Sequence, residues 1–113
     1  MTAAAGEPDI AGAVWRALAD NNRRTILRLV RDQPRSVGEI TEHVAISQQA
    51  VSRHLRVLHG AGLVSSHREG TRHLFAVRAD GLAQVRHYLD QFWPTQLAAL
   101  KHAVETSTTK GKA

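Results

Sequence analysis

The sequence contains no cysteine, which excludes disulfide bonds and thiolate metal sites. It also lacks an apolar run of the ~20 residues that cross a bilayer. Its first residues show no basic segment followed by an apolar one, as a secretory signal would. We therefore expect a soluble, cytoplasmic protein with no membrane partner. A length of 113 residues, 42% of them hydrophobic and few aromatic, suits one small helical domain with a modest core.

Acidic residues are missing from one long stretch of the chain. No Asp or Glu occurs from His43 to Arg68, although the whole chain carries a formal net charge of +5. The three lysines all lie beyond residue 100, so every Lys or Arg of the inner chain is an arginine. A GC-rich genome would also enrich arginine. Because arginine binds phosphates and base edges through two parallel hydrogen bonds, this charge distribution favours an anionic partner.

Within this stretch, residues 47–59 combine an apolar side with a polar side. Val51, Leu55 and Leu58 recur at helical spacing and are expected to face a core. Several side chains that can reach base edges and phosphates fall on the opposite side: Gln48, Gln49, Ser52, Arg53 and Arg56. An ordinary solvated face usually mixes both signs of charge. The pattern therefore favours a helix that contacts nucleic acid.

Local start and stop signals predict four helices, at residues 10–19, 21–32, 37–44 and 47–59. Asp20 and Ser47 can cap the second and the fourth of them. Ser36 and Glu39 have the spacing of a capping box for the third. Two helices joined by a tight turn, with the cationic face on the second, describe a helix-turn-helix.

Two short strands are expected next, at residues 63–68 and 72–77, around the turn Glu69-Gly70-Thr71. With Gly70 at the apex, Leu63 would pair with Val77, His67 with His73, and Arg68 with Arg72. Since like charges across a hairpin destabilise it, we expect either an anion between the two arginines or side chains that splay into solvent.

The order α-α-α-α-β-β-α predicts a mainly helical winged helix-turn-helix with a small β-hairpin. The hairpin would be the wing, which contacts the DNA backbone or the minor groove. Its predicted DNA-binding residues are Arg68, Gly70, Thr71 and Arg72.

The last helical segment, residues 80–105, carries an apolar stripe that a small domain cannot cover alone. The stripe consists of Leu82, Val85, Leu89, Phe92, Trp93, Leu97, Leu100 and Val104. It keeps its phase through Pro94, so we expect one bent helix or two nearly collinear ones. We expect the stripe to form a dimer interface, because a palindromic DNA site is bound by a protein with two-fold symmetry. The predicted interface residues are Trp15, Leu89, Phe92, Trp93, Leu97 and Leu100. Alternatively, the stripe packs back on the first two helices. Residues 1–9 and 106–113 are expected to be flexible tails on a single domain at 10–105.

Three segments within residues 14–105 resemble the ArsR/SmtB family of bacterial winged-helix repressors: WRALADNNRRTILRLV, RSVGEITEHVAISQQAVSRHLRVLHGAGLV and HREGTRHLFAV. The resemblance implies a homodimer, joined through its first and last helices, that binds an imperfect inverted repeat in a promoter, its own included. It further implies that Gln48, Gln49, Ser52, Arg53 and His54 enter the major groove. Together with Ser47 and Arg56, these are the seven predicted recognition residues. Arg68, Gly70 and Arg72 would then belong to the wing.

The metal sites of that family are incomplete in this chain. Its metal sensors carry Cys-x-Cys in the third helix, where this chain has the segment 36–41 with Glu39 as the sole ligand type. A zinc site on the last helix would need ligands upstream of His102 and Glu105, but Leu89 and Gln91 stand there. The chain therefore resembles the metal-independent branch, and we expect no metal and no cofactor. A zinc ion held by the cross-strand histidines 67 and 73 is a weaker alternative.

The sequence carries no catalytic motif such as GxSxG, HExxH or a Gly-rich phosphate loop, so we do not expect an enzyme. The hypothesis is a homodimeric, sequence-specific DNA-binding repressor whose effector the sequence leaves open. Two alternatives remain: a winged helix that binds proteins, and a metal-responsive repressor that uses histidines and carboxylates alone. An acid-free face on the fourth helix argues against the first of them.

Overall fold

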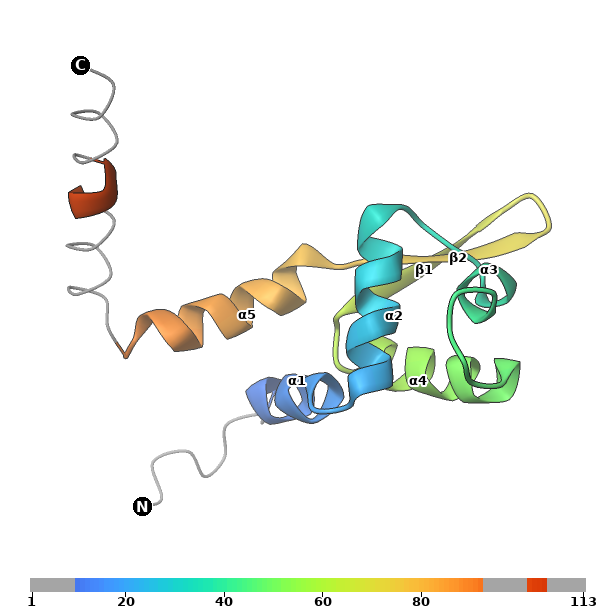
Figure 1. Cartoon of the computed structure of the whole chain (residues 1–113), viewed down its shortest axis with the longest axis horizontal. Coiled ribbons are helices and arrows are strands. Elements are labelled where there is room, and N and C mark those ends of the chain that lie inside the picture. Colours follow the sequence, from blue (N-terminus) through green and yellow to red (C-terminus); the bar gives the residue numbers. More distant parts are fainter. Residues whose placement is uncertain (1–9, 93–101, 106–113) are drawn as a thin grey trace.

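The helix and strand order agrees with the predicted winged helix-turn-helix (Figure 1). The computed structural model describes residues 10–92 and 102–105. Its elements are α1 (Ile10–Leu18), α2 (Asn21–Asp32), α3 (Val37–Thr41), α4 (Gln48–Gly60), β1 (Val64–Glu69), β2 (Arg72–Val77) and α5 (Ala79–Asp90). The predicted tails at 1–9 and 106–113, and the predicted interface residues Trp93, Leu97 and Leu100, lie outside the described residues.

The three predicted N-terminal caps are confirmed. Asp20 Oδ1 accepts a hydrogen bond from the backbone N–H of Arg23 at 3.1 Å, and Ser47 Oγ accepts one from Ala50 at 3.1 Å. Ser36 and Glu39 form the full capping box, because each side chain accepts from the other's backbone N–H, at 3.2 Å and 2.9 Å. These contacts satisfy amide groups that a helix start would otherwise leave unpaired, and thereby set where α2, α3 and α4 begin.

Helix α3 is shorter than predicted, ending at Thr41 instead of residue 44. The backbone N–H of His43 donates to Ile40 O at 2.9 Å, and that of Val44 donates to Thr41 O at 3.4 Å. Bonds of this three-residue spacing belong to a tighter turn than an α-helix. The tighter turn brings the chain round to Ser47, where α4 begins.

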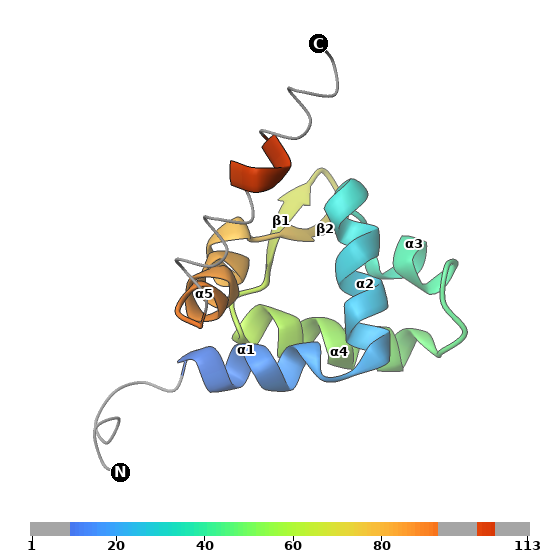
Figure 2. The ribbon, with the colours of Figure 1, turned by 60° about the vertical axis from the view of Figure 1, so that its left-hand side comes forward.

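The core lies around α4, which packs against α1, α2, α3 and β1 (Figure 2). Its apolar side is fully covered, with Val51, Leu55 and Leu58 at most 1% exposed. The other large side chains that are almost completely buried are Val14, Ile26, Val30, Ile40, Leu63 and Val64. Burial of side chains of this size contributes about 1.5–3 kcal/mol each, so the core fixes α4 with its other side turned outward.

The predicted register of the hairpin is wrong by one residue. Val64 pairs with Val77, Ser66 with Phe75, and Glu69 with Arg72, so the turn contains only Gly70 and Thr71. Gly70 has a φ of +65°, the left-handed conformation that a two-residue turn requires at its first central position. A slip of one residue changes every cross-strand pair.

Three predicted pairs are therefore corrected. Leu63 does not face Val77 but precedes β1, where its carbonyl accepts from Arg78 N at 2.9 Å. His73 lies across from Arg68, not from His67. The two arginines 68 and 72 do not oppose each other, so the expected repulsion, and the anion suggested between them, have no basis in the register.

A short bridge joins the α2–α3 connection to the hairpin. Arg35 N donates to Phe75 O at 3.0 Å, and Phe75 N donates to Arg35 O at 2.8 Å. The Arg35 side chain also donates through Nε to Leu29 O at 2.9 Å, which ties the same residue to α2. The inner part of β2 is thereby fixed to the helical body.

Helix α5 leans away from the helical body, and its main contact is with α1 (Figure 1). Its start is held by Gly81, which is buried against the turn after α4: a Cβ at this position would collide with the carbonyl oxygen of Gly62. The helix ends at Asp90, with Gln91 as its C-cap, before the expected kink at Pro94. No helix in the described part of the chain is long and apolar enough to cross a membrane.

The predicted apolar stripe divides within α5. Leu82 and Val85 pack against the core, as the single-subunit alternative expected. Leu89 and Phe92 remain 39% and 61% exposed, as a contact with another molecule would require. The continuation of the stripe through residues 93–101 lies outside the described residues.

Candidate nucleic-acid interface

The polar side of α4 forms an exposed surface opposite the core. Ser47, Gln48, Gln49, Arg53 and Arg56 are exposed, and Ser52 is half-buried. A shallow hollow of about 490 Å³ lies among Gln48, Gln49, Ser52 and Arg56. Helix α4 itself contains no acidic residue. The structure therefore brings six of the seven predicted recognition residues onto one face that donates hydrogen bonds and carries positive charge.

The N-terminal end of α4 strengthens this positive character. Ser47 caps the helix, and the first turn contains Gln48 and Gln49 but no acidic residue. The partial positive charge of a helix N-terminus is therefore not neutralised by a carboxylate within the helix. Both glutamine amides can donate to and accept from a base edge.

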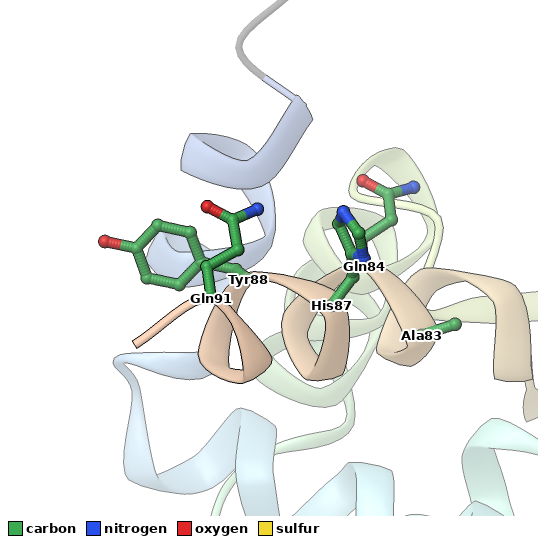
Figure 3. Close-up of a pocket in the computed structure, with 5 residues that line it drawn as sticks. All are labelled: Ala83, Gln84, His87, Tyr88 and Gln91. Carbon is green, nitrogen blue, oxygen red and sulfur yellow. The ribbon is translucent and has the colours of Figure 1, made fainter. Parts of the chain in front are cut away.

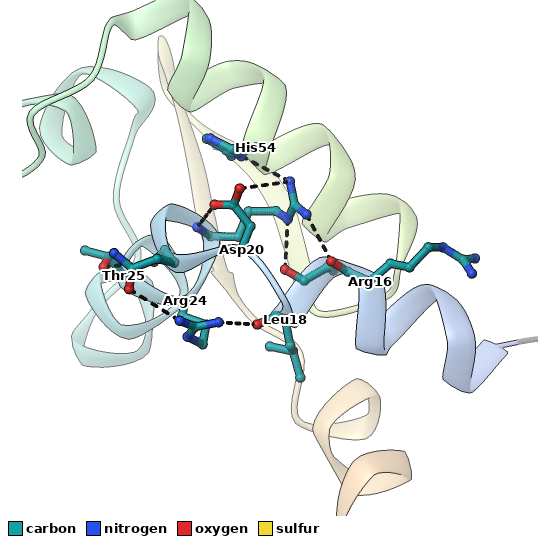
Figure 4. Close-up of polar contacts among 9 residues, drawn as sticks. Arg16, Leu18, Asp20, Arg24, Thr25 and His54 are labelled. Atoms are coloured by element: carbon teal, nitrogen blue, oxygen red, sulfur yellow. Dashed lines mark hydrogen bonds and ion pairs between the residues drawn. The ribbon is translucent and has the colours of Figure 1, made fainter.

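His54, the seventh predicted residue, is directed elsewhere. It is half-buried on the side of α4 that faces the α1–α2 junction, where Nη1 of Arg23 donates to its Nδ1 at 3.3 Å (Figure 4). Because a guanidinium only donates, Nδ1 must accept here, and the ring proton belongs on Nε2. His54 therefore contacts Arg23 at the α1–α2 junction and is not part of the exposed face of α4.

Arg23 holds three elements together at this junction. Besides His54 of α4, it donates through Nε to Ala17 O at 2.8 Å and through Nη2 to Arg16 O at 3.0 Å, both near the end of α1. Its side chain is only 18% exposed. The Arg23 backbone N–H also donates to Asp20, and this bond lowers the pKa of the Asp20 carboxyl below its ordinary value of 3.8. We name these contacts the Arg23 clamp.

The wing residues predicted from the sequence are all exposed around the hairpin turn: Arg68, Gly70, Thr71 and Arg72. Arg72 reaches back to the helix-turn-helix, where Nη2 donates to Glu39 Oε1 at 2.7 Å. The Ser36 backbone N–H, and after it the charge of Arg72, lower the pKa of Glu39 below its ordinary value of 4.5. Arg72 therefore helps to position the wing against α3.

Sequence reasoning missed the Arg23 clamp and the Arg72–Glu39 ion pair. Their partners lie 31 and 33 residues apart in the chain, and no local pattern connects them. The bridge from Arg35 to Phe75 was missed for the same reason. All three contacts determine how α4 and the hairpin are held against the rest of the fold.

A second exposed surface lies where α5 meets α1. The rings of Trp15 and Tyr88 meet edge to face at 5.6 Å, and those of Tyr88 and Phe92 do so at 5.0 Å. These side chains are 37%, 41% and 61% exposed, so the aromatic cluster remains open to a partner. Gln84, His87, Tyr88 and Gln91 project from one side of α5 beside it (Figure 3). We name Trp15, Tyr88, Leu89 and Phe92 the aromatic surface.

The histidines of the described residues do not assemble a metal site. No three His, Asp or Glu side chains among residues 10–92 and 102–105 lie close enough to hold a metal ion. His67 and His73 point to opposite faces of the hairpin, because His67 pairs with Leu74 and His73 pairs with Arg68. His102 and Glu105 are exposed on a helical segment.

Comparison with known proteins agrees with this geometry. The family model described as "Bacterial regulatory protein, arsR family" matches residues 20–66. The HTH-type transcriptional regulator Rv2034 of Mycobacterium tuberculosis is 38% identical over 92 residues, which cover 81% of this chain and 86% of that protein. The transcriptional repressor SdpR of Bacillus subtilis is 40% identical over 57 residues, covering 50% of this chain and 63% of SdpR.

Among solved structures, the homodimeric winged helix-turn-helix DNA-binding domain of Mb0332 from Mycobacterium bovis superposes with a TM-score of 0.65 and 29% identity. The match covers 80% of this chain and 88% of that one. Because sequence and fold agree over most of its length, the chain belongs to the ArsR family of bacterial transcriptional regulators.

Proposed function

We propose that the protein is a homodimeric transcriptional repressor that reads promoter DNA with α4. The exposed face of α4 carries this proposal: it presents Gln48, Gln49, Ser52, Arg53 and Arg56, and the helix has no carboxylate. A helix that enters the major groove must pass between two rows of phosphates, so a carboxylate there would be repelled. Ser47 caps the start of α4 and is exposed. A helix N-terminus binds anions, so we assign Ser47 to a contact with a backbone phosphate.

Each side chain of this face has a distinct proposed task. Arg53 is proposed to bind guanine through two hydrogen bonds, and Gln48 and Gln49 are proposed to bind adenine or another base edge. The wing residues Arg68, Gly70, Thr71 and Arg72 are proposed to contact the backbone beside the groove, and Arg72 also pairs with Glu39. Repression follows physically when a protein bound over a promoter excludes the polymerase, and SdpR is named a repressor. Promoter DNA as a partner places this action in the bacterial cytoplasm.

The aromatic surface supports a two-fold dimer. Trp15, Leu89 and Phe92 leave apolar area exposed at the α1–α5 contact, and the Mb0332 domain is described as homodimeric. Trp93, Leu97 and Leu100 are proposed to extend this interface. Two copies of α4 would then lie about 34 Å apart, one helical turn of DNA, and would read an inverted repeat.

The test selects duplexes from a random DNA pool with the purified wild-type protein and measures binding by fluorescence anisotropy. Arg53→Ala should lose about 1–3 kcal/mol of binding to the selected site and should relax the preference at one base position. Arg31→Ala is the matched control, because it removes an arginine of equal charge that is exposed on α2 and pairs with Asp32. Equal affinity of the Arg53→Ala variant and the wild type for the selected site would reject α4 as the reader.

A further inference from the structure

A cleft of about 330 Å³ lies between α4 and the hairpin, beside the exposed polar face of α4. Its polar side chains come from both elements: Ser52, Arg56 and His59 from α4, and Ser66 and His73 from the strands. Among the described residues, those that line the cleft include no Asp or Glu. The cleft therefore offers an anion several hydrogen-bond donors and the positive charge of Arg56, and the described lining contains no carboxylate that would repel one.

The spacing along α4 and the pairing of the two strands explain why these side chains lie close together. Positions 52, 56 and 59 are spaced by four and three residues, so they share one side of α4. On the hairpin, Ser66 is the cross-strand partner of Phe75, and His73 lies two residues before Phe75. These three side chains therefore share one face of the hairpin. The His73 ring packs on Phe75 with centroids 4.8 Å apart, which fixes its orientation.

The floor of the cleft is apolar and consists of Val37, Leu55 and Phe75. Leu55 belongs to the buried core, and Val37 and Phe75 pack against it. An apolar floor lowers the local dielectric constant, which strengthens the attraction between the Arg56 guanidinium and a bound anion.

The cleft is continuous with the reading face of α4. Ser52 and Arg56 line both the cleft and the hollow next to Gln48 and Gln49. The rise from Gln49 to His59 is about 15 Å, at 1.5 Å per helical residue, whereas a major groove is about 12 Å wide. With the N-terminal end of α4 at the bases and its axis tilted across the groove, His59 would lie at the wall of the groove, which is the phosphate backbone.

We propose that this cleft holds one backbone phosphate of the DNA, and that Arg56, His59 and His73 are its donors. The inference rests on the proposed function and adds a ligand and two histidines to it. Because α4 and the wing contact the same phosphodiester, binding at the cleft sets the register of the reading helix along the DNA without reading sequence.

The test compares His59→Gln, His73→Gln and the double variant with the wild type on the selected duplex. His67→Gln is the matched control, because His67 is exposed on the same hairpin but pairs with Leu74 and faces the other way. The double variant should lose affinity roughly ten-fold, equally for selected and unrelated DNA, if each histidine contributes one ordinary hydrogen bond. Its thermal midpoint should match that of His67→Gln, which shows that the fold is intact.

A position-by-position scan locates the phosphate. Each backbone phosphate is replaced in turn by an uncharged methylphosphonate. One position in each half-site should weaken the wild type but leave the double variant unaffected. The proposal is overturned if no position is coupled to the histidines, or if the double variant binds like His67→Gln. It is also overturned if inorganic phosphate shifts the ring NMR signals of His59 and His73 while the scan stays flat, since the cleft then binds a free anion. A wild type that selects no DNA at all would instead reject the proposed function.

Discussion

The Arg23 clamp allows a quantitative test of how α1 and α4 are joined. Replacing Arg23 by Ala removes the donors to Ala17 O at 2.8 Å, Arg16 O at 3.0 Å and His54 Nδ1 at 3.3 Å. Two of these acceptors are carbonyl groups near the α1 C-terminus, and the guanidinium is largely covered, with 18% of the side chain exposed. At about 0.5–1.5 kcal/mol for each of the three bonds, the free energy of unfolding should fall by about 1.5–4.5 kcal/mol.

The neighbouring Arg24 is the matched control. It also donates to a carbonyl of α1, Leu18 O at 2.8 Å, and to Asn21 Oδ1 at 3.4 Å, but its side chain is exposed. Water replaces such bonds at little cost, so Arg24→Ala should lower the unfolding free energy by only about 0.5–1 kcal/mol. Urea unfolding followed by circular dichroism, at one protein concentration for all variants, measures both values. A loss for Arg23→Ala that is no larger than the loss for Arg24→Ala would refute the reasoning.

A double-mutant cycle isolates the contact with α4. Arg23→Ala and His54→Ala, measured singly and together, should show a coupling of about 0.5–1.5 kcal/mol, since each substitution removes one side of the same hydrogen bond. Additive losses would mean that Arg23 stabilises the end of α1 without contributing to the position of α4.

Three other results are expected. Phe92→Glu places a charge on the aromatic surface and should yield monomers in sedimentation; dimers that persist would remove Phe92 from the proposed interface. Gly81→Ala forces a methyl group against the Gly62 carbonyl and should lower the unfolding free energy by about 1–3 kcal/mol, whereas Gly60→Ala, with nothing within 4 Å of its Cβ, should not. The pKa of Glu39 is lowered, so its stabilisation is present above the ordinary value of 4.5 and is lost as the pH falls through the lowered pKa. Glu39→Gln, whose amide oxygen can still accept the capping hydrogen bond from Ser36 N, should remove that part of the acid sensitivity in denaturation measured across pH.

Local patterns in the sequence were sufficient for the starts of α2, α3 and α4 and for most of the exposed face of α4. Asp20, Ser36 and Ser47 cap helices through bonds to residues three positions ahead, so the spacing alone predicts them. The exposed side of α4 follows equally from the periodicity of Val51, Leu55 and Leu58, because a helix that buries one side must expose the other.

The failures concern pairs of residues that are distant in the chain or close to a boundary. His54 lies at the edge of the polar side, where the helical period does not decide between solvent and the α1–α2 junction. The hairpin register depended on whether its turn contained three residues or two, and Gly70 is compatible with both. The cleft residues His59 and His73 could not be brought together before that register was known.

The bridge between Arg35 and Phe75 also limits the entropy that the wing can lose. Phe75 is fixed to the helical body and pairs with Ser66, so the part of the hairpin beyond this pair, residues 67–74, projects past the anchored base. Conformational freedom that a ligand removes must come from this short overhang, because the base is already held. Binding of a ligand by the wing therefore loses less conformational entropy than binding by a free loop of the same length would.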